Sequence, residues 1–493
     1  MKHRCLTGAA VAAVMTAGPA LAEMDEIVVE ATRRAENLQS VPVAVSAFGT
    51  EQIAKLQIDT TQDIGDNVPN LQTYTVTAGA QALQLHARGA SVQNPGFNTS
   101  ESPVGFYVDD VYSGRLASIN LDLTDIERIE VLRGPQATLY GRNTIAGAVK
   151  VYSRTPGDEL YANASVGAGD YDTVQAKGAI GGPIIEGALA ASVAINYHKR
   201  DDGWIDNPAT GKEQGEFDNK IGRAKLHYYG IDNLDVKLSV WGVDAENDGY
   251  NGIPYVPFGS VDGSGPLGDF YDNFSPNGTS GGDSEQSGGT LDISYELGDL
   301  TLRSITAVST IDDNFSFGLA GGGFLGFTGV PGLLVDSDSN MDQWSQELQV
   351  LGSSFSDRLE WIVGFFYLNE DGDQDYRGFA GDGINPPAVD FLEAIDTETD
   401  NYSVYGEGTW AFNDRLSATV GLRWSKDEKD FSIDCLPGSG GTSTCVPTTT
   451  GLSVKLDENY DEWTPRFGLD YQLNDKWLTY LSAGKGFQAG GFQ

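Results

Sequence analysis

The sequence predicts an N-terminal α+β domain followed by an all-β antiparallel transmembrane barrel. Helical and strand periodicities are mixed in residues 37–156, whereas residues 157–493 alternate apolar and polar side chains with a period of two. Such alternation is typical of half-buried antiparallel strands. Short turns and long loops also alternate between these strands, which favours a barrel that spans a membrane.

Residues 1–22 are predicted to be a secretory signal peptide. Lys2 and Arg4 give a basic start, residues 6–17 are apolar or small, and Ala20-Leu21-Ala22 provides an A-x-A cleavage site. A short buried helix is the alternative, and the helix-breaking Gly18-Pro19 pair argues against it.

The chain carries 31 basic and 70 acidic side chains, a formal net charge of −39 at pH 7. Phosphate binding needs a basic surface, so nucleic acid is not an expected partner. After the signal, no stretch approaches the roughly 20 apolar residues of a membrane helix. This does not argue against a membrane location, because a closed β-barrel satisfies its own backbone there.

The segment before residue 157 is long enough for a domain with its own core. Thr50 is the expected N-cap of its first helix, and Pro69 is expected to stop the second. The expected elements are helices at residues 50–56 and 61–68 and strands at residues 104–112 and 126–132.

Residues 125–149 form the most informative part of this domain. An alternating strand is followed by a Gly134-Pro135 turn and a run of small residues. Gly141 and Gly147 allow main chains to approach closely. We therefore expect a small, tightly wound α/β element here.

About thirteen strands are predicted after residue 156 from the period-two pattern. Short turns are expected at 230–233, 297–299, 413–414 and 474–475, and long loops at 200–217, 246–287, 312–340, 370–398 and 430–458. In outer-membrane barrels the connections are short turns at one end and long loops at the other. Aromatic residues near the strand ends suit the aromatic belts at the membrane interfaces. A secreted soluble β-sandwich or propeller would not explain the asymmetry of the loops.

Cys435 and Cys445 lie close together in a stretch rich in Pro, Gly, Ser and Thr. In an oxidising compartment we expect a disulfide that closes a loop, and two isolated thiols are the alternative. Neither a metal site nor a cofactor is predicted, because no His or further Cys stands nearby.

Several segments resemble TonB-dependent outer-membrane receptors, in which a plug domain fills a barrel. Residues 41–48 resemble the start of the plug, residues 85–89 and 104–111 its middle, residues 125–156 its end, and residues 484–492 a barrel strand. The resemblance implies a plug at residues 37–156 and a transmembrane barrel from residue 157 onward. It also implies location in the bacterial outer membrane, with outer-membrane lipid as a partner.

The N-terminal extension, residues 23–36, contains a segment that resembles a TonB box. Its residues are Asp25, Glu26, Ile27, Val28, Val29, Glu30 and Ala31. A short, β-prone and otherwise untethered segment can add a strand to a periplasmic partner. The implied partner is TonB, together with the inner-membrane proteins that energise it.

The resemblance further implies a 22-stranded barrel in the intact protein. Only about thirteen strands are predicted here, and the chain stops at Gln493 inside an apparent strand. The sequence is therefore interpreted as a fragment lacking roughly nine strands of an intact protein of on the order of 700–750 residues.

Charge pairs inside the barrel would seal the plug and still separate under a pulling force, since water can replace them. The expected participants are Glu130, Arg133 and Arg142 in the plug and Glu347, Glu407 and Arg423 in the barrel. We predict that Arg133 or Arg142 meets Glu347 or Glu407. Solvated lumen charges without fixed partners are the alternative.

The implied function is uptake of a scarce small molecule, with a ferric siderophore as the expected ligand. Ligand contacts are expected in the loop of residues 91–102, from Gln93, Asn94, Phe97 and Asn98. A solvent-exposed linker is the alternative for this loop. His86 is interpreted as structural rather than as a haem ligand, and the Asp371–Asp375 tract as a solvated loop rather than a calcium site.

No nucleophile–base constellation or nucleotide-binding loop is present, so an enzyme is not predicted. Asp109-Asp110 is interpreted as a turn rather than an acid/base pair. Two other functions stay open from the sequence. One is an uncoupled outer-membrane β-protein, such as an adhesin or passive porin. The other is TonB-dependent uptake of an oligosaccharide, an aromatic compound or cobalamin.

Overall fold

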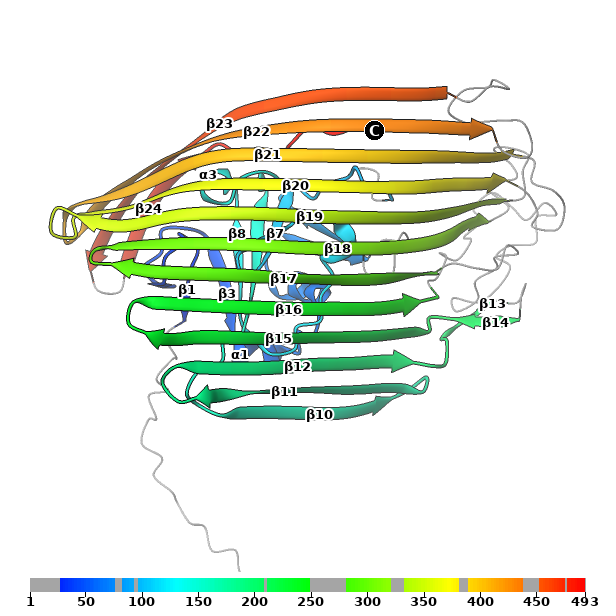
Figure 1. The fold of residues 1–493 in the computed structure, drawn as a ribbon, viewed down its shortest axis with the longest axis horizontal. Coiled ribbons are helices and arrows are strands. Elements are labelled where there is room, and N and C mark those ends of the chain that lie inside the picture. Colours follow the sequence, from blue (N-terminus) through cyan, green and yellow to red (C-terminus); the bar gives the residue numbers. More distant parts are fainter. Residues whose placement is uncertain are drawn as a thin grey trace, which may run out of the picture.

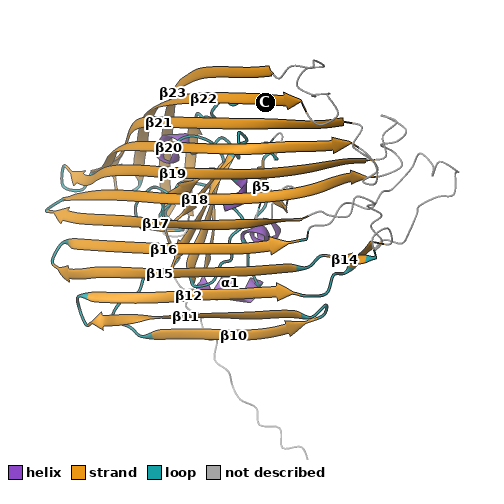
Figure 2. Cartoon of the chain, turned by 45° about the vertical axis from the view of Figure 1, so that its right-hand side comes forward, coloured by secondary structure: helices purple, strands orange, loops and turns teal. Residues whose placement is uncertain are grey.

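The computed structural model describes residues 27–75, 82–92, 96–207, 211–248, 281–320, 332–380, 389–437, 452–474 and 477–492. A 13-stranded antiparallel sheet forms a long curved wall, and a smaller α+β domain lies behind its strands (Figures 1 and 2). The predicted fold class and strand number are confirmed. Within the described part of the chain, the wall is an open sheet whose edge strands are β10 and β24.

The smaller domain, the plug, is built on a five-stranded sheet in the order β3-β8-β9-β6-β7. Only β6 and β9 run parallel; the other neighbours are antiparallel. Phe106, Ile129 and Val149 from the central strands are fully buried in an apolar core. The elements are β1 (Val28–Val29), β2 (Glu36–Asn37), β3 (Val45–Gly49), α1 (Thr50–Leu56), η1 (Thr61–Asp63), α2 (Ile64–Asn67), β4 (Leu71–Thr75), β5 (Leu83–Ala87), β6 (Val104–Val108), β7 (Val111–Ser113), η2 (Leu116–Ser118), β8 (Ile126–Arg133), α3 (Ala137–Tyr140) and β9 (Gly147–Ser153).

The start of α1 differs from the prediction by one residue. Gly49 is the N-cap, and Thr50 is the first helical residue. The Thr50 hydroxyl lies 3.2 Å from the carbonyl oxygen of Ile126 and 3.0 Å from that of Glu127, to which it donates. Thr50 therefore attaches the helix to β8 instead of capping it.

The wall consists of long strands joined in sequence order. They are β10 (Tyr161–Gly169), β11 (Thr173–Ile185), β12 (Leu189–Arg200), β15 (Phe217–Ile231), β16 (Leu234–Asn247), β17 (Gly281–Leu297), β18 (Leu300–Ala320), β19 (Gly332–Ser354), β20 (Leu359–Ala380), β21 (Val389–Asn413), β22 (Leu416–Pro437), β23 (Leu452–Asn474) and β24 (Trp477–Gly484). A separate small hairpin pairs β13 (Ile205–Asn207) with β14 (Lys212–Gln214). Short turns join the strands at one end, as predicted.

Three predicted long loops, at residues 312–340, 370–398 and 430–458, are wrong because much of each is strand. The β18–β19 ladder, for example, continues without a register shift to the pair Ala320 and Gly332. Apolar alternation stops where both strand faces carry polar side chains, such as Asp312 and Asp313 on β18, and the prediction relied on that alternation. The ladder continues because it is made by backbone groups rather than side chains.

Residues 485–492 were expected to continue a barrel strand, and this is also wrong. The β23–β24 ladder ends at the pair Arg466 and Gly484. The next residue of β23 is Pro465, which accepts a hydrogen bond from the Lys485 amide at 3.1 Å but has no N–H to extend the ladder. The segment instead contacts the plug, where the Ala489 amide donates to Asn143 Oδ1 at 3.1 Å.

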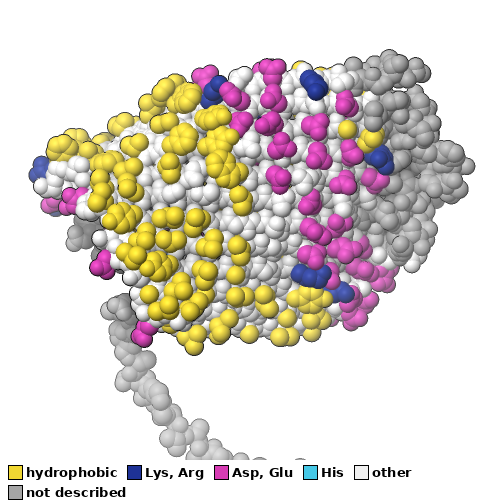
Figure 3. Space-filling view, in the orientation of Figure 1, with side chains coloured by type: hydrophobic (Ala, Val, Ile, Leu, Met, Phe, Trp, Pro, Cys, Tyr) yellow, Lys and Arg dark blue, Asp and Glu magenta, His cyan; other side chains and the backbone are white. Residues whose placement is uncertain are grey.

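The two faces of the wall have opposite character. On β21, Val404 faces outward and is 49% exposed, whereas its neighbour Ser403 faces the plug and is fully buried. Figure 3 shows the outward apolar side chains as a broad band, beside which acidic side chains gather toward the long-loop end. An apolar outer band with a polar interior is the pattern of a membrane-spanning β-barrel wall. No helix of the described residues is long and apolar enough to span a membrane.

Candidate functional site at the plug–wall interface

The 125–149 segment positions a short helix against the wall. β8, a turn, α3 and β9 follow one another, as the predicted compact element requires. Gly141 ends α3 with a φ of 85°, and a Cβ there would lie 2.5 Å from the Arg423 guanidinium. A Cβ on Gly147 would lie 2.3 Å from the Leu132 carbonyl oxygen. Both glycines therefore permit the close contacts that place Tyr140 and Arg142.

Arg142 lies at the centre of a buried charge cluster, the Glu101 network. The network joins Glu101, Arg115 and Arg142 of the plug to Glu370, Asp427 and Lys429 of the wall. Arg142 contacts Glu101 directly, and its guanidinium lies 3.2 Å from Asp427 and 3.8 Å from Glu370. Arg115 lies 3.2 Å from Glu370, and Lys429 lies 2.9 Å from Glu101.

The Glu101 network is balanced in charge, with one cation for each carboxylate. Burial alone would raise the pKa of Glu101, but nearby Arg142 and Lys429 outweigh it and hold that pKa well below its ordinary value. Arg142 in turn has its pKa raised despite burial, because Asp427 and Glu101 stabilise its charge. Glu101 and Arg142 are therefore both favoured in their charged forms.

A second cluster, the Asp110 network, lies closer to the N-terminal segment. Asp110 is contacted by Arg33 at 3.0 Å, Lys150 at 3.1 Å and the wall residue Arg303 at 3.1 Å. Arg33 also reaches Glu347 of the wall at 3.3 Å. Burial would raise the pKa of Asp110, but these cations lower it far more. Asp110 ends a strand in a tight turn with a φ of 66°, as predicted, and also carries these ion pairs.

The predicted interface pairs are corrected by this arrangement. Arg142 does cross to the wall, but it meets Asp427 and Glu370 instead of Glu347 or Glu407. Glu347 pairs with Arg33, which the prediction did not consider. Glu407 pairs at 3.1 Å with Arg466 of β23, which lies two strands along the wall from β21.

Among the described residues, the remaining three predicted charges form no ion pair between plug and wall. Glu130 contacts Arg128 at 2.9 Å within the plug. The Arg133 Nε atom is buried without a hydrogen-bond partner among the described residues. Arg423 faces the plug as predicted, but lies over the rings of Phe366 and Tyr405.

The alternation of inward and outward residues along β22 could have identified part of the Glu101 network. Asp427 and Lys429 lie four and six residues after Arg423, so they share its inward face on β22. Glu101 and Arg115 lie in plug loops, where no periodicity indicates direction. Arg33 lies in the N-terminal extension, two residues after the segment that is expected to be untethered.

The N-terminal segment is packed against the plug from Ile27 onward, which contradicts the expectation of an untethered TonB box. β1 pairs with β2, and Val29 and Ala31 are fully buried. Glu30 is held by Arg128 at 2.7 Å. The apolar side chains that make the segment β-prone also favour its burial in the absence of a partner. Asp25 and Glu26 lie outside the described residues.

The loop expected to contact a ligand meets the wall directly. The Phe97 ring lies 4.8 Å from that of Tyr376. The Asn98 amide donates to Gln374 Oε1 at 2.9 Å, and the Asn98 carbonyl accepts from Arg115. The Asn98 side-chain amide is buried without a hydrogen-bond partner among the described residues. Gln93 and Asn94 lie outside the described residues, so their predicted role stays a prediction.

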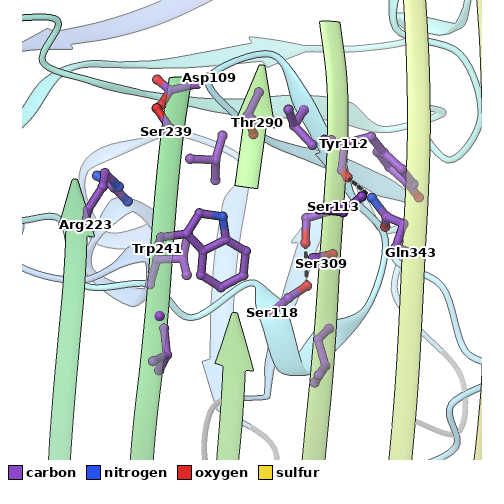
Figure 4. Close-up of a pocket in the computed structure, with 18 of the residues that line it drawn as sticks. Asp109, Tyr112, Ser113, Ser118, Arg223, Ser239, Trp241, Thr290, Ser309 and Gln343 are labelled. Atoms are coloured by element: carbon purple, nitrogen blue, oxygen red, sulfur yellow. Dashed lines mark hydrogen bonds between the residues drawn. The ribbon is translucent and has the colours of Figure 1, made fainter. Parts of the chain in front are cut away.

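A cavity separates the plug from β15–β18, beside the Glu101 and Asp110 networks. Figure 4 shows Trp241 projecting into this cavity between Arg223 and the hydrogen-bonded Ser113 and Ser118. Gln343 of β19 closes one side by donating to the Tyr112 carbonyl at 2.9 Å. Trp241 is one of the aromatic residues for which the sequence suggests an interfacial belt, but it belongs to the inward face of β16 and lines this cavity.

Other predicted features have simpler surroundings. His86 lies 2.7 Å from Gln84 Oε1 on the same strand. Cys435 is disulfide-bonded, while Cys445 lies outside the described residues, so the predicted pairing stays a prediction. The Asp371–Asp375 tract is part of strand β20 rather than a loop. Within the described part of the chain, no group of three or more His, Cys, Asp or Glu residues is arranged to hold a metal ion.

Two relatives show the similarity at the level of sequence. The pesticin receptor of Yersinia enterocolitica is 25% identical over 416 residues, which cover 83% of this chain and 55% of that protein. The vitamin B12 transporter BtuB of Vibrio vulnificus is 27% identical over 197 residues, which cover 39% of this chain and 30% of that protein. The chain thus spans about half the length of the pesticin receptor.

Two solved structures share the fold. The ferric yersiniabactin uptake receptor FyuA from Yersinia pestis matches with a TM-score of 0.74 at 20% identity, over 89% of this chain and 63% of that chain. The open form of the ferric-catecholate import receptor Fiu from E. coli K12 matches with a TM-score of 0.72 at 15% identity, over 92% of this chain and 71% of that chain.

Two family models match the sequence and cover both structural parts. The TonB-dependent receptor plug domain matches residues 37–148, and the TonB-dependent receptor-like β-barrel matches residues 226–493. The barrel match alone covers more than half of the chain. This outer-membrane protein therefore belongs to the TonB-dependent receptor family.

Proposed function

We propose that the receptor takes up a ferric siderophore by TonB-driven remodelling of the plug. The observation that carries this proposal is the way the plug contacts the wall. The plug has its own apolar core, and it is attached to the wall by the charged Glu101 and Asp110 networks together with one apolar cluster that includes Tyr107 and Tyr405. Charged contacts can be exchanged for water when the plug moves, so the domain can shift without losing its core.

The names of similar proteins support an iron-carrying ligand. Two structures of the same fold are described as receptors for ferric yersiniabactin and for ferric catecholates. Catecholates are aromatic, and the plug presents Phe97 next to Tyr376 of the wall. We propose that Phe97 and Asn98, together with Gln93 and Asn94, contact the ligand.

Cobalamin is the second candidate ligand, because the match to a vitamin B12 transporter covers 39% of the chain. An uncoupled pore is less well supported. In the described part of the chain, plug side chains contact wall strands from β11 to β23, which would obstruct passive diffusion.

Uptake measurements separate these functions. Cells expressing the receptor under iron limitation are given ⁵⁵Fe-labelled ferric catecholate and ferric phenolate siderophores, or labelled cobalamin. Deletion of residues 25–31 should abolish uptake and leave surface binding of the ligand intact. Unchanged uptake after this deletion would support a passive pore, and transport of cobalamin alone would overturn the siderophore assignment.

A further inference from the structure

The backbone of the N-terminal segment is held by side chains of the plug. The Tyr140 hydroxyl donates to the carbonyl oxygens of Glu30 at 2.8 Å and Ala31 at 3.0 Å. Lys150 Nζ donates to the same Glu30 carbonyl at 3.1 Å and to the Tyr140 hydroxyl at 3.0 Å. The Glu30 amide donates to Glu130 Oε1 at 2.8 Å.

These contacts use the groups that strand addition requires. A partner that adds a strand pairs with backbone N–H and C=O groups along an accessible edge. Here the Ile27 carbonyl accepts from the Leu38 amide at 2.9 Å, and the Glu30 carbonyl accepts from the Arg33 amide at 3.0 Å. Val29 and Ala31 are fully buried, although Val28 between them and the chain start is 47% exposed, so a strand-adding partner meets only part of the segment.

The position of Tyr140 lets its hydroxyl bind the backbone of the N-terminal segment. Tyr140 is the last residue of α3, and its ring lies beside Arg33 and Lys150 at 4.7 and 4.8 Å. Its backbone carbonyl accepts from the Tyr107 hydroxyl at 2.7 Å. The ring is therefore fixed by its packing, and its hydroxyl reaches the backbone of residues 30 and 31.

We propose that Tyr140 and Lys150 are positioning residues that hold residues 28–31 against the plug and out of reach of the periplasmic partner. The proposal rests on TonB coupling as the proposed function and adds the residues that control access to the coupling segment. Removal of the Tyr140 hydroxyl takes one donor from the Ala31 carbonyl and one from the Glu30 carbonyl, which keeps Lys150 Nζ and the Arg33 amide as donors. The apolar contacts of the ring stay in place. The segment then opens more often without any ligand.

Hydrogen exchange of the receptor in outer-membrane vesicles tests this proposal without ligand or TonB. In Tyr140→Phe, amides of residues 27–38 should exchange about tenfold faster than in the wild type, as expected for loss of a buried hydrogen-bonding group. Amides of β8 and β9 should keep their protection. Tyr112→Phe is the matched control, because its buried hydroxyl accepts from Asn143 at 3.0 Å and does not contact the segment.

Equal exchange in the wild type and Tyr140→Phe would overturn the proposal. Faster exchange throughout β8 and β9 would also count against it, because the hydroxyl would then support the whole plug. So would an equal effect in Tyr112→Phe. Failure of siderophore uptake in the separate transport assay would remove the proposed function and leave this exchange result as it stands.

Discussion

Two regions of the plug–wall interface use charged side chains in different ways. Where the plug meets β20 and β22, Arg142 of the plug pairs with Asp427 of β22, and their side chains are only 2% and 0% exposed. Where the plug meets β11, Lys177 of that strand contacts Asp59 of the plug, and their side chains are 29% and 46% exposed. Between these regions the cavity around Trp241 leaves part of the wall without close plug contact.

The difference indicates where the plug is firmly attached. A buried ion pair loses much when one partner is removed, because the other charge stays desolvated. An exposed pair exchanges its partner for water at little cost. We therefore expect the Glu101 network to hold the plug against the wall and the contacts near β11 to contribute little.

The largest effect is expected from Arg142→Met. The change removes the cation that contacts three buried carboxylates and should destabilise plug docking by about 3–5 kcal/mol. Limited proteolysis of the plug in outer-membrane vesicles, with thermal unfolding, measures this loss. Arg133→Met is the matched control, since the Arg133 Nε atom has no hydrogen-bond partner among the described residues. Equal effects of the two substitutions would contradict the special role of Arg142.

An intermediate effect is expected from Lys225→Met. Lys225 Nζ lies 3.3 Å from Asp109 and donates to the Ser153 carbonyl at 3.2 Å. Loss of these contacts should cost about 1–3 kcal/mol, because Asp109 keeps some access to water. The same proteolysis assay ranks this variant between the two extremes. A loss as large as that of Arg142→Met would show that the two regions do not differ.

A small effect is expected from Lys177→Met. Its pair with Asp59 is half exposed and should contribute only about 0–1 kcal/mol. Protease resistance of the plug should match the wild type within error, in both low and high salt. A clear salt-dependent loss would show that the exposed side of the interface carries more of the docking energy than its burial suggests.

No change is expected between pH 8 and pH 5. Burial would raise the pKa values of Glu101 and Asp109, but neighbouring cations lower both. A carboxylate with a lowered folded-state pKa stabilises the fold above its unfolded pKa of about 4, and the stabilisation disappears as the pH falls below that value. Plug protection should therefore stay constant down to pH 5 and decline only in stronger acid. A loss of plug protection already at pH 6 would contradict the lowered pKa values of Glu101 and Asp109.

Local patterns in the sequence were sufficient for several parts of the fold. The order Gly134-Pro135, Gly141 and Gly147 predicts the compact β8–α3–β9 element, because each glycine permits a conformation or contact that other residues resist. Period-two alternation predicts thirteen strands and the inward direction of Glu347, Glu407 and Arg423. Both predictions depend on backbone geometry and on the nearest neighbours along the chain.

Those local patterns could not identify the partners of the inward-facing charged side chains. The period-two alternation shows that Glu347 faces the plug, but only the docking of the plug against the wall brings Arg33 to Glu347. The ends of the strands were missed because ladder hydrogen bonds leave no side-chain signal where both faces carry polar residues. The expected untethered segment was wrong because apolar residues suited to a partner strand are equally suited to burial.

By itself, the sequence determined an exported chain with an α+β plug, a period-two wall with an apolar outer face, and the family to which both belong. The tertiary structure alone decided that Arg142 meets Asp427 and Glu370, that Asp110 gathers Arg33, Lys150 and Arg303, and that Tyr140 closes over Glu30 and Ala31. These contacts join residues up to several hundred positions apart. Their energies depend on burial and orientation, which arise only when the two parts are assembled.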